Sequence, residues 1–215
     1  MKNHNESSVT IHVFPVGQMG ANCYLVVDRK TREAVVVDPG DEASFLAEQI
    51  VRLEAKPVKL LATHGHFDHL LAAAELQMIF TIPFLLHEKD SFLLSRMTQT
   101  AAHFLGYTVV EQPPKLTKPL TQNDRILFGN AAVRVIHTPG HTPGSVCFYL
   151  EQNGELFTGD TLFAGGSVGR SDFSYSDPHE LTKSVKEILR LPTSVRLFPG
   201  HGQSTSIGVE RSFQV

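Results

Sequence analysis

The sequence predicts an α/β protein of the α+β kind, built as a four-layer αββα sandwich. Two observations of element order predict this fold class. Apolar, strand-like runs are followed by helical segments in the first half of the chain, and the same order recurs in the second half. Two such halves can bury their sheets against each other and carry their helices outside. No residue-level repeat accompanies this pseudo-symmetry, so it rests on element order alone.

The first half is expected to open with a hairpin and to continue with strands and helices. A Gly-rich turn at 17–22 divides the apolar stretch 9–27, and Pro57 is expected to end a helix. In chain order, the expected elements are the hairpin 9–27, a buried strand 34–37, a helix 42–56, a strand 58–62, a helix 70–80, a strand 83–87, a helix 89–105 closed by Gly106, and a loop 110–124.

The second half is expected to be mostly strand, because its apolar runs are short and separated by turn residues. In chain order, the expected elements are strands at 126–128, 132–136, 145–150 and 156–158, a helix at 178–191 and a strand at 195–198.

Composition favours one domain over 1–215, with a polar tail over 1–8. The 215 residues are 41% hydrophobic and 19% charged, which suits one substantial core. The formal charge of -3 gives no electrostatic reason to expect nucleic acid or an anionic membrane as a partner. A small-molecule substrate is therefore expected, and the sequence makes no prediction of oligomeric state.

The compartment is expected to be the cytoplasm. The polar amino end is followed by no apolar segment of signal-peptide length, and the longest apolar runs fall far short of the ~20 residues that cross a bilayer. Cys23 and Cys147 each lie in an apolar, strand-like run, so two buried thiols are expected rather than a disulfide.

The segment Thr-His-Gly-His-Phe-Asp-His at 63–69 organises the chain. Three imidazoles and a carboxylate fall within six positions, between an expected strand and an expected helix. Alternating histidines beside a carboxylate are typical of a metal site. The alternative is that Asp68 caps the following helix and the histidines are exposed loop residues. His87 and His103 lack a partner at ligand spacing and are expected to be structural or surface residues.

Three later loops carry further ligand-type residues, each directly after an expected strand. His141 lies at the centre of a turn rich in Pro and Gly, Asp160 ends a strand, and His201 lies between two glycines. Each loop alone is more typical of an ordinary turn.

Together, the four loops supply seven nitrogen and oxygen ligands. They are His64, His66, Asp68, His69, His141, Asp160 and His201. A divalent ion takes three or four such ligands plus water, so seven suit two ions if one carboxylate bridges them. Zn is the expected metal, with Fe and Mn as alternatives because they accept the same ligands.

Six short motifs are distributed over nearly the whole chain. They are Asn-Cys-Tyr-Leu-Val at 22–26, Val-Asp-Pro-Gly at 37–40, His-x-His-x-Asp-His at 64–69, His-Thr-Pro-Gly-His-Thr-Pro-Gly-Ser at 137–145, Gly-Asp-Thr-Leu-Phe at 159–163 and Pro-Gly-His-Gly at 199–202. In this combination the chain resembles the metallo-β-lactamase superfamily and, within it, the glyoxalase II-like hydrolases. The resemblance implies the metallo-β-lactamase type of αββα sandwich.

The resemblance also implies roles for the ligand residues. His64, His66 and His141 would hold one metal, and Asp68, His69 and His201 would hold the second. Asp160 would bridge the two metals, and Asp68 would also orient the attacking hydroxide, so both carboxylates are expected to be catalytic.

Asp38, His137 and Arg170 are expected around the ligands. Asp38 and His137 are expected to steady the ligand loops, because metal-bound imidazoles usually donate their other N–H to a fixed acceptor. Turn formation by Asp38 and strand-end packing by His137 are the alternatives. Arg170, in Gly-Arg-Ser-Asp-Phe at 169–173, matches a loop where the family has a basic residue close to the substrate carboxylate. Its alternative is a structural pair with Asp172 or Asp160.

The chemistry expected of such a site is hydrolysis by a metal-bridging hydroxide. Two ions lower the pKa of a shared water and polarise a carbonyl, so no serine or cysteine nucleophile is required. A thioester suits the site because a thiol with a pKa of ~8.5 departs as thiolate without a strong acid. The leading prediction is a hydrolase of a glutathione or other thiol ester, such as S-lactoylglutathione.

Two alternatives lie within the same superfamily. One is a mononuclear iron oxidoreductase resembling the persulfide dioxygenases, which bind iron through residues matching His64, His141 and Asp160. The other is a lactonase. Glyoxalase II enzymes carry an additional carboxy-terminal helical region that grips glutathione, whereas this chain stops 14 residues after His201, as shorter relatives do. Glutathione specificity therefore does not follow from the resemblance.

Overall fold

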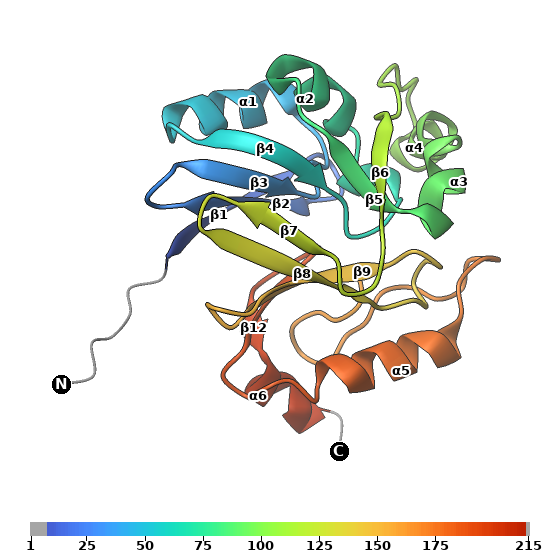
Figure 1. Ribbon diagram of the computed structural model, residues 1–215. Coiled ribbons are helices and arrows are strands. Elements are labelled where there is room, and N and C mark those ends of the chain that lie inside the picture. The colour runs from blue at the N-terminus through green and yellow to red at the C-terminus, as the bar shows by residue number, and fades with distance from the viewer. Residues whose placement is uncertain (1–7, 214–215) are drawn as a thin grey trace.

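The computed structural model describes residues 8–213, which form two six-stranded sheets packed face to face with helices outside them (Figure 1). This arrangement is the four-layer αββα sandwich that the element order predicted. Apart from Ser8, the polar tail predicted over 1–8 lies outside the described residues, and the single domain over 1–215 stays a prediction.

The first sheet holds the first half of the chain in the strand order β1-β2-β3-β4-β5-β6. Its strands are β1 (Val9–Val16), β2 (Ala21–Asp28), β3 (Glu33–Val37), β4 (Lys56–Leu61), β5 (Phe84–His87) and β6 (Leu116–Leu120). The pairs from β3 to β6 are parallel. The loops after β3, β4 and β5 therefore leave from the same edge of the sheet.

The second sheet holds the second half in the order β12-β11-β10-β9-β8-β7. Its strands are β7 (Arg125–Phe128), β8 (Ala131–His137), β9 (Val146–Leu150), β10 (Glu155–Gly159), β11 (Arg196–Pro199) and β12 (Thr205–Ser206). β10 and β11 are parallel, so the residues that follow them emerge side by side.

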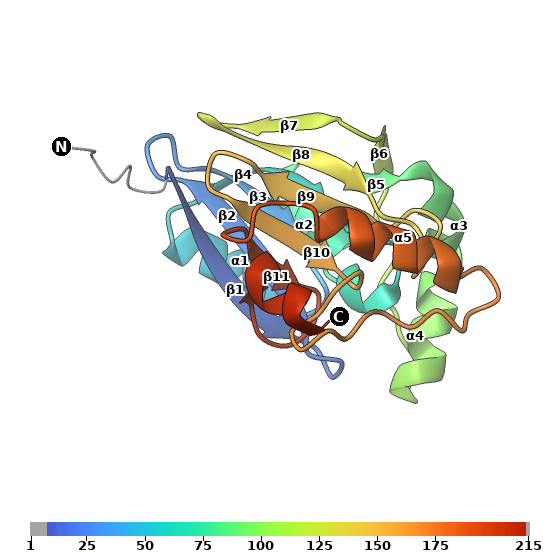
Figure 2. The same ribbon diagram turned by 90° about the horizontal axis from the view of Figure 1, so that it is seen from below.

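Helices cover the outer face of each sheet (Figures 1 and 2). α1 (Ala43–Arg52), α2 (Ala73–Phe80), α3 (Ser91–Leu94) and α4 (Met97–Leu105) lie on the side of the first sheet, whereas α5 (Pro178–Ile188) and α6 (Ile207–Glu210) lie on the side of the second. Among residues 8–213, no helix combines the length and apolarity that crossing a bilayer requires.

The strands alternate their side chains between two layers of core. In β2, Leu25 packs in the core under the helices, whereas Tyr24 and Val26 pack in the core between the sheets. In β9, Phe148 faces the other sheet, whereas Tyr149 packs with residues of α5. The period of two explains why almost continuously apolar strands are buried on both faces here.

Several predicted boundaries were wrong. The helix predicted over 42–56 ends at Arg52, because Glu54 takes a left-handed conformation with φ 52° and turns the chain. Pro57 does not end that helix; it lies inside β4, at a register shift opposite Ala34. The helix predicted over 70–80 begins at Ala73, since a short 3-10 turn precedes it.

Some helices and strands were also merged or missed in the prediction. The helix predicted over 89–105 is interrupted between α3 and α4 at 95–96. The loop predicted over 110–124 contains β6, an edge strand with Pro119 inside it. Proline is tolerated at a sheet edge, where its missing N–H removes no ladder bond, but it conceals the strand in the sequence. β12 and α6 were not predicted.

Candidate metal centre

The loop after β4 positions four of the seven predicted ligands. β4 is an interior strand of the first sheet, and the chain passes from it through Thr63 into His64 and His66. A 3-10 turn at Phe67–His69 then brings Asp68 and His69 back toward the same space. Crevices at the carboxyl ends of parallel strands are common ligand sites.

The other three predicted ligands come from the second sheet. His141 lies in the loop between β8 and β9, Asp160 follows β10 directly, and His201 follows β11. The two sheets are joined at this edge, because the N–H of Asn22 in β2 donates to the carbonyl of Gly200 at 2.7 Å. The Tyr24 hydroxyl donates to the carbonyl of Pro199 at 2.6 Å.

Glycines permit this close approach of loops. Gly159 has a φ of 48°, and a side-chain carbon there would lie 2.3 Å from Oγ1 of Thr63. A side-chain carbon on Gly200 would lie 2.3 Å from Oδ1 of Asp160. Both glycines are therefore required by the space between the loops, and Gly159 is also favoured by its left-handed backbone conformation.

The structure brings all seven predicted ligand residues together. Nδ1 of His66 lies 3.1 Å from Nε2 of His64 and 2.9 Å from Nε2 of His141. The other four residues lie next to these three histidines, and among them Nε2 of His201 is 3.3 Å from Oδ2 of Asp68. Three groups have ligand atoms within 4.8 Å of one another: His64, His66 and His141; His64, His69 and Asp160; Asp68, His69 and His201.

Asp160 lies between the two sides of the cluster. Its Oδ1 is 3.5 Å from Nε2 of His69, and its Oδ2 is 3.6 Å from Nε2 of His141 and 3.8 Å from Nε2 of His201. This intermediate position is what a bridging carboxylate requires.

The side chains fit a cation by their own geometry. Nε2 of His69 and Oδ1 of Asp160 are buried and have no hydrogen-bond partner. Such atoms are costly to leave unsatisfied, and several ring nitrogens here point at one another rather than at a donor. A divalent cation would satisfy all of them, and imidazole with carboxylate is a ligand set that Zn, Fe and Mn accept.

The charges of the cluster are also suited to a cation. Burial lowers the pKa of His66 to about 3 and the pKa of His64 well below its usual value, so both rings are neutral, as metal ligands must be. Burial alone would lower the pKa of His69, but the carboxylates of Asp68 and Asp160 override it and raise the pKa to about 10. The raised pKa shows that the two carboxylates facing His69 stabilise positive charge at this position.

Asp38 holds the loop after β4 in place. Its carboxylate accepts hydrogen bonds from the backbone N–H and the hydroxyl of Thr63, both at 2.7 Å. Its Oδ2 also lies 3.1 Å from Nδ1 of His69. If Nδ1 carries the proton, Nε2 is left free to face the cluster.

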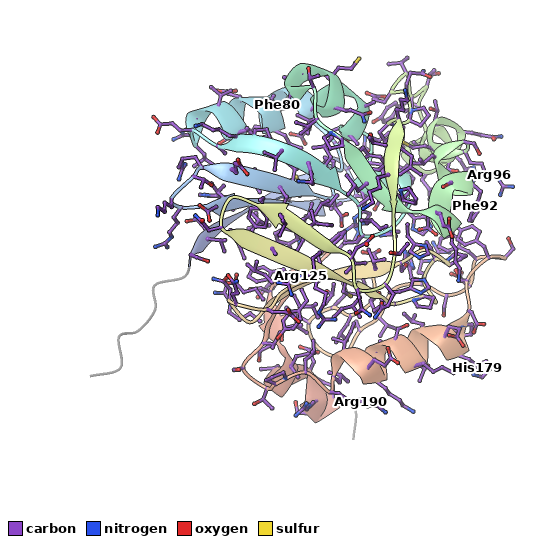
Figure 3. All side chains as sticks on the ribbon, in the orientation of Figure 1. Phe80, Phe92, Arg96, Arg125, His179 and Arg190 are labelled. Atoms are coloured by element: carbon purple, nitrogen blue, oxygen red, sulfur yellow. The ribbon has the colours of Figure 1, made fainter. Side chains whose placement is uncertain are left out.

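Two further ligand rings have partners on their other nitrogens. Nδ1 of His141 lies 2.7 Å from the carbonyl of Arg170 and donates to it. Nε2 of His66 lies 2.8 Å from the hydroxyl of Tyr175. Tyr175 is held by stacking on Phe173 at 5.3 Å and by an edge contact with Phe92, which is labelled on α3 in Figure 3. Tyr175 was not predicted from the sequence, since a lone tyrosine in a polar loop carries no spacing signal.

Asp90, which joins two ligand loops, was also not predicted from the sequence. This buried carboxylate accepts from the N–H of Gly65 at 2.9 Å, from the hydroxyl of Thr142 at 2.6 Å and from the N–H of Gly144 at 2.6 Å. In the sequence it lies in Glu-Lys-Asp, which is typical of an exposed helix start, so only the long-range contacts reveal its burial.

His137 lies beside the cluster without contacting a predicted ligand. Its Nε2 lies 2.9 Å from the carbonyl of Pro143, in the loop that carries His141. The ring of His137 stacks on the ring of His87, with 4.4 Å between their centroids, so His87 has a packing role. His103 is exposed on α4.

A pocket of about 240 Å³ opens over the cluster. Arg170 lines it, but its guanidinium is paired with Asp172 through hydrogen bonds of 3.0 and 2.9 Å. The structure therefore shows the ion pair that was the alternative to substrate binding, at the rim of the pocket.

Sequence comparison assigns the family. The sequence profile of the Metallo-beta-lactamase superfamily matches residues 16–201, a span that includes every predicted ligand. The chain belongs to this superfamily. This match confirms the predicted fold family, whose members are generally hydrolytic metalloenzymes.

Individual relatives are similar over nearly their whole length. The chain is 34% identical over 206 residues to hydroxyacylglutathione hydrolase GloC of Haemophilus influenzae, covering 94% of this chain and 95% of GloC. The solved structure of BLEG-1, a B3 metallo-beta-lactamase, has a TM-score of 0.87 and 33% identity, covering 94% of this chain and 97% of that one. The structure of TTHA1623 in a di-iron-bound form has a TM-score of 0.83 and 36% identity, covering 93% and 96%.

Proposed function

We propose that the chain is a dinuclear metal-dependent hydrolase of thioesters, of which S-lactoylglutathione is the first to test. The observation that carries this proposal is the convergence of seven imidazoles and carboxylates from four loops, with two buried atoms that lack a hydrogen-bond partner. The substrate class is supported by GloC, a hydroxyacylglutathione hydrolase similar over 94% of the chain.

The proposed ligand assignment follows the two sides of the cluster. His64, His66 and His141 would hold one ion, and Asp68, His69 and His201 the other, with Asp160 between them. When bound, two such ions lower the pKa of water toward neutrality and polarise a substrate carbonyl. Zn is the expected metal, and the di-iron form of TTHA1623 makes iron the first alternative.

The protein's own groups would orient the attack. Burial opposes ionisation of Asp68, but His69 and His201 outweigh it and lower the pKa of Asp68, so this carboxylate is ionised. It lines the pocket, where it can accept a hydrogen bond from the attacking water and turn the water's lone pair toward the carbonyl. Asp38 and the carbonyl of Arg170 would keep His69 and His141 in the orientations this requires.

The leaving group favours a thioester over an amide. A thiol with a pKa of ~8.5 departs as thiolate, whereas an amide nitrogen must receive a proton as it leaves. Asp68, being ionised, cannot supply that proton. The ionised state of Asp68 therefore suits a substrate whose leaving group does not need to be protonated.

The deciding experiment combines elemental analysis of the purified protein with hydrolysis of S-lactoylglutathione in the presence and absence of oxygen. We expect about two divalent ions per chain, as a two-metal site requires, and cleavage that is independent of oxygen. One iron per chain, with oxygen consumed in the presence of glutathione persulfide, would instead identify a persulfide dioxygenase-like oxidoreductase.

The bridging role proposed for Asp160 has its own test. Asp160→Ala should abolish turnover and lower metal content, because it removes the carboxylate that faces both sides of the cluster. Circular dichroism should show that the fold is kept. Glu48→Ala, which removes an exposed carboxylate on α1, is the control and should keep full metal content. Full activity in Asp160→Ala would remove the bridging assignment.

A further inference from the structure

The pocket over the cluster has large apolar side chains in its walls. Met19 comes from the turn between β1 and β2, Phe104 from α4, and Val168 from the loop after β10. They are 46%, 45% and 42% exposed. Scattered apolar residues on a surface need no explanation, but three from distant segments lining one pocket indicate a binding surface.

Aromatic rings flank the predicted ligands on both sides. The ring of Phe173 lies 5.3 Å from that of His66, and the ring of Phe163 lies 6.2 Å from that of His201. Phe104 extends this wall by stacking on Phe67 at 5.8 Å. A group attached to either side of a reacting carbonyl would therefore meet apolar surface.

The carboxylates of glutathione have little to bind in this pocket. Arg170 is the one lysine or arginine among the described residues that line it, and its guanidinium already has Asp172 as a partner and lies 4.6 Å from the ring centroid of Phe173. Glutathione carries two carboxylates and an ammonium group. A substrate carboxylate at this rim would have to compete with Asp172.

The pocket is also too small to enclose the whole of glutathione. Its volume of about 240 Å³ is below the range of roughly 300–1,000 Å³ that is usual for sites enclosing a drug-sized ligand. The pocket can therefore enclose the reacting end of a thioester and a compact group beside it, while a peptide tail would remain outside.

We propose that this pocket selects its substrate by an uncharged apolar group, aromatic or branched, next to the cleaved bond, rather than by the charged ends of glutathione. The inference rests on the proposed thioester hydrolase and specifies its substrate class. The apolar group can belong to the acyl half or to the thiol half, since both present the same hydrocarbon surface to the walls.

The first test measures binding without catalysis. Thioethers resist hydrolysis, so isothermal titration of the metal-loaded protein can compare S-benzyl and S-methyl derivatives of glutathione and of neutral N-acetylcysteamine. We expect benzyl to bind about tenfold or more tightly than methyl in both series, as several buried CH groups allow. Glutathione and N-acetylcysteamine should differ by less than about threefold, because the pocket encloses neither tail. A large preference for glutathione that Arg170→Ala removes would overturn the inference.

The second test locates the apolar group. Hydrolysis of S-phenylacetyl- and S-acetyl-N-acetylcysteamine tests the acyl half, and S-acetyl esters of benzyl mercaptan and of N-acetylcysteamine test the thiol half. We expect kcat/KM to be about tenfold or more higher for the aromatic member of at least one pair. Equal values in both pairs would overturn the inference.

Variants of the walls provide the structural control. Met19→Ser and Phe104→Ala should each lower the ratio of kcat/KM for the aromatic ester to kcat/KM for the acetyl ester about fivefold or more, through lost apolar contact. Met78→Ser on α2, 73% exposed, and Phe45→Ala on α1, 38% exposed, remove the same side-chain types outside the pocket. Both control variants should leave the ratio of kcat/KM for the aromatic ester to that for the acetyl ester unchanged. If Met19→Ser or Phe104→Ala also leaves this ratio unchanged, that side chain does not bind the apolar group.

The two proposals can fail separately. If the metal-loaded protein cleaves no thioester but binds benzyl thioethers preferentially, the proposed reaction is wrong and the inferred recognition stands. If it cleaves thioesters without regard to the apolar group, the reaction stands and the inferred recognition is wrong.

Discussion

Two buried carboxylates outside the predicted ligand set hold the loops that carry it. Asp38 accepts from Thr63 and lies against His69, so it orients a ligand ring directly. Asp90 contacts no ligand side chain but accepts three hydrogen bonds from two loops. One of these loops carries His64 and His66 and the other carries His141. At the scale of single residues, Asp90 thus determines how far apart three of the predicted ligands are held.

Asp90→Asn should weaken metal binding on the side of His64, His66 and His141. The amide places an NH₂ group where a carboxylate oxygen now accepts from an N–H, so one loop loses its anchor. Loss of an outer-shell group that supports metal ligands typically weakens metal binding by about 10–100-fold. Competition with a chelator would measure the change. Asp124→Asn is the matched control, because Asp124 also accepts a backbone N–H, from Thr121 at 2.9 Å, but outside the site. Equal metal affinity in the two variants would contradict the role of Asp90.

Metal loading should release protons at pH 7. In the metal-free protein, the pKa of His69 is raised to about 10 and that of His201 is also raised, so His69 is protonated at pH 7. A ligand ring must be neutral, so binding expels its proton, whereas His64 and His66 are already neutral. We expect about one proton or more per chain, read by titration in buffers of different ionisation enthalpy. Release that falls to zero at pH 7 would contradict the charge assigned to His69.

At the scale of elements, the site is made where strands end. A ligand lies within three residues of the ends of β4, β10 and β11, and glycines at 159 and 200 let these ends approach each other. The strands therefore set the directions of the ligands, and the glycines set the separation between loops.

Gly200→Ala should lower the metal content of the protein and remove the stability that bound metal contributes. The added carbon would lie 2.3 Å from Oδ1 of Asp160 and 2.8 Å from Cε1 of His69, so the cluster must open. Gly20→Ala is the contrast, since Gly20 has a φ of 63° and nothing within 4 Å of the added carbon. It should lose about 1 kcal/mol of unfolding free energy through backbone strain and keep its metal. Elemental analysis and thermal unfolding distinguish the two, and full metal content in Gly200→Ala would contradict the crowding argument.

At the scale of the whole molecule, the cluster joins the two sheets. Four predicted ligands come from the first sheet and three from the second, at the edge where Asn22 and Tyr24 bond to the end of β11. Ions bound here would hold the halves together, so metal binding should contribute to the stability of the fold.

Removal of metal should therefore lower the thermal unfolding midpoint. Saturation at a thousand times Kd stabilises a folded protein by about 4 kcal/mol, and for a chain of this size each kcal/mol shifts the midpoint by roughly 2–4 °C. We expect a decrease of about 10 °C on chelation, measured by calorimetry. Asp160→Ala should show a smaller decrease, because it binds less metal before chelation. An unchanged midpoint in the unsubstituted protein would show that the cluster does not join the sheets energetically.

Much of the architecture could be predicted from local patterns. The layers followed from element order, and the ligand loops followed from imidazoles and carboxylates placed directly after apolar strands. The errors fell where local signals conflict with tertiary context. Pro57 and Pro119 lie in two strands, β4 and β6, that the rest of the first sheet stabilises, and proline alone predicted a helix end in one case and a loop in the other.

By itself, the sequence determined the layered fold class and the seven residues with metal-ligand chemistry, because strand periodicity and ligand type are properties of a few neighbouring residues. The tertiary structure decided which of these groups face one another, which carboxylates hold them and what surrounds them. Asp90 lies 52 residues from Thr142, and Asn22 lies 177 residues from Pro199. Contacts over such separations depend on how two sheets pack, and no local pattern records that packing.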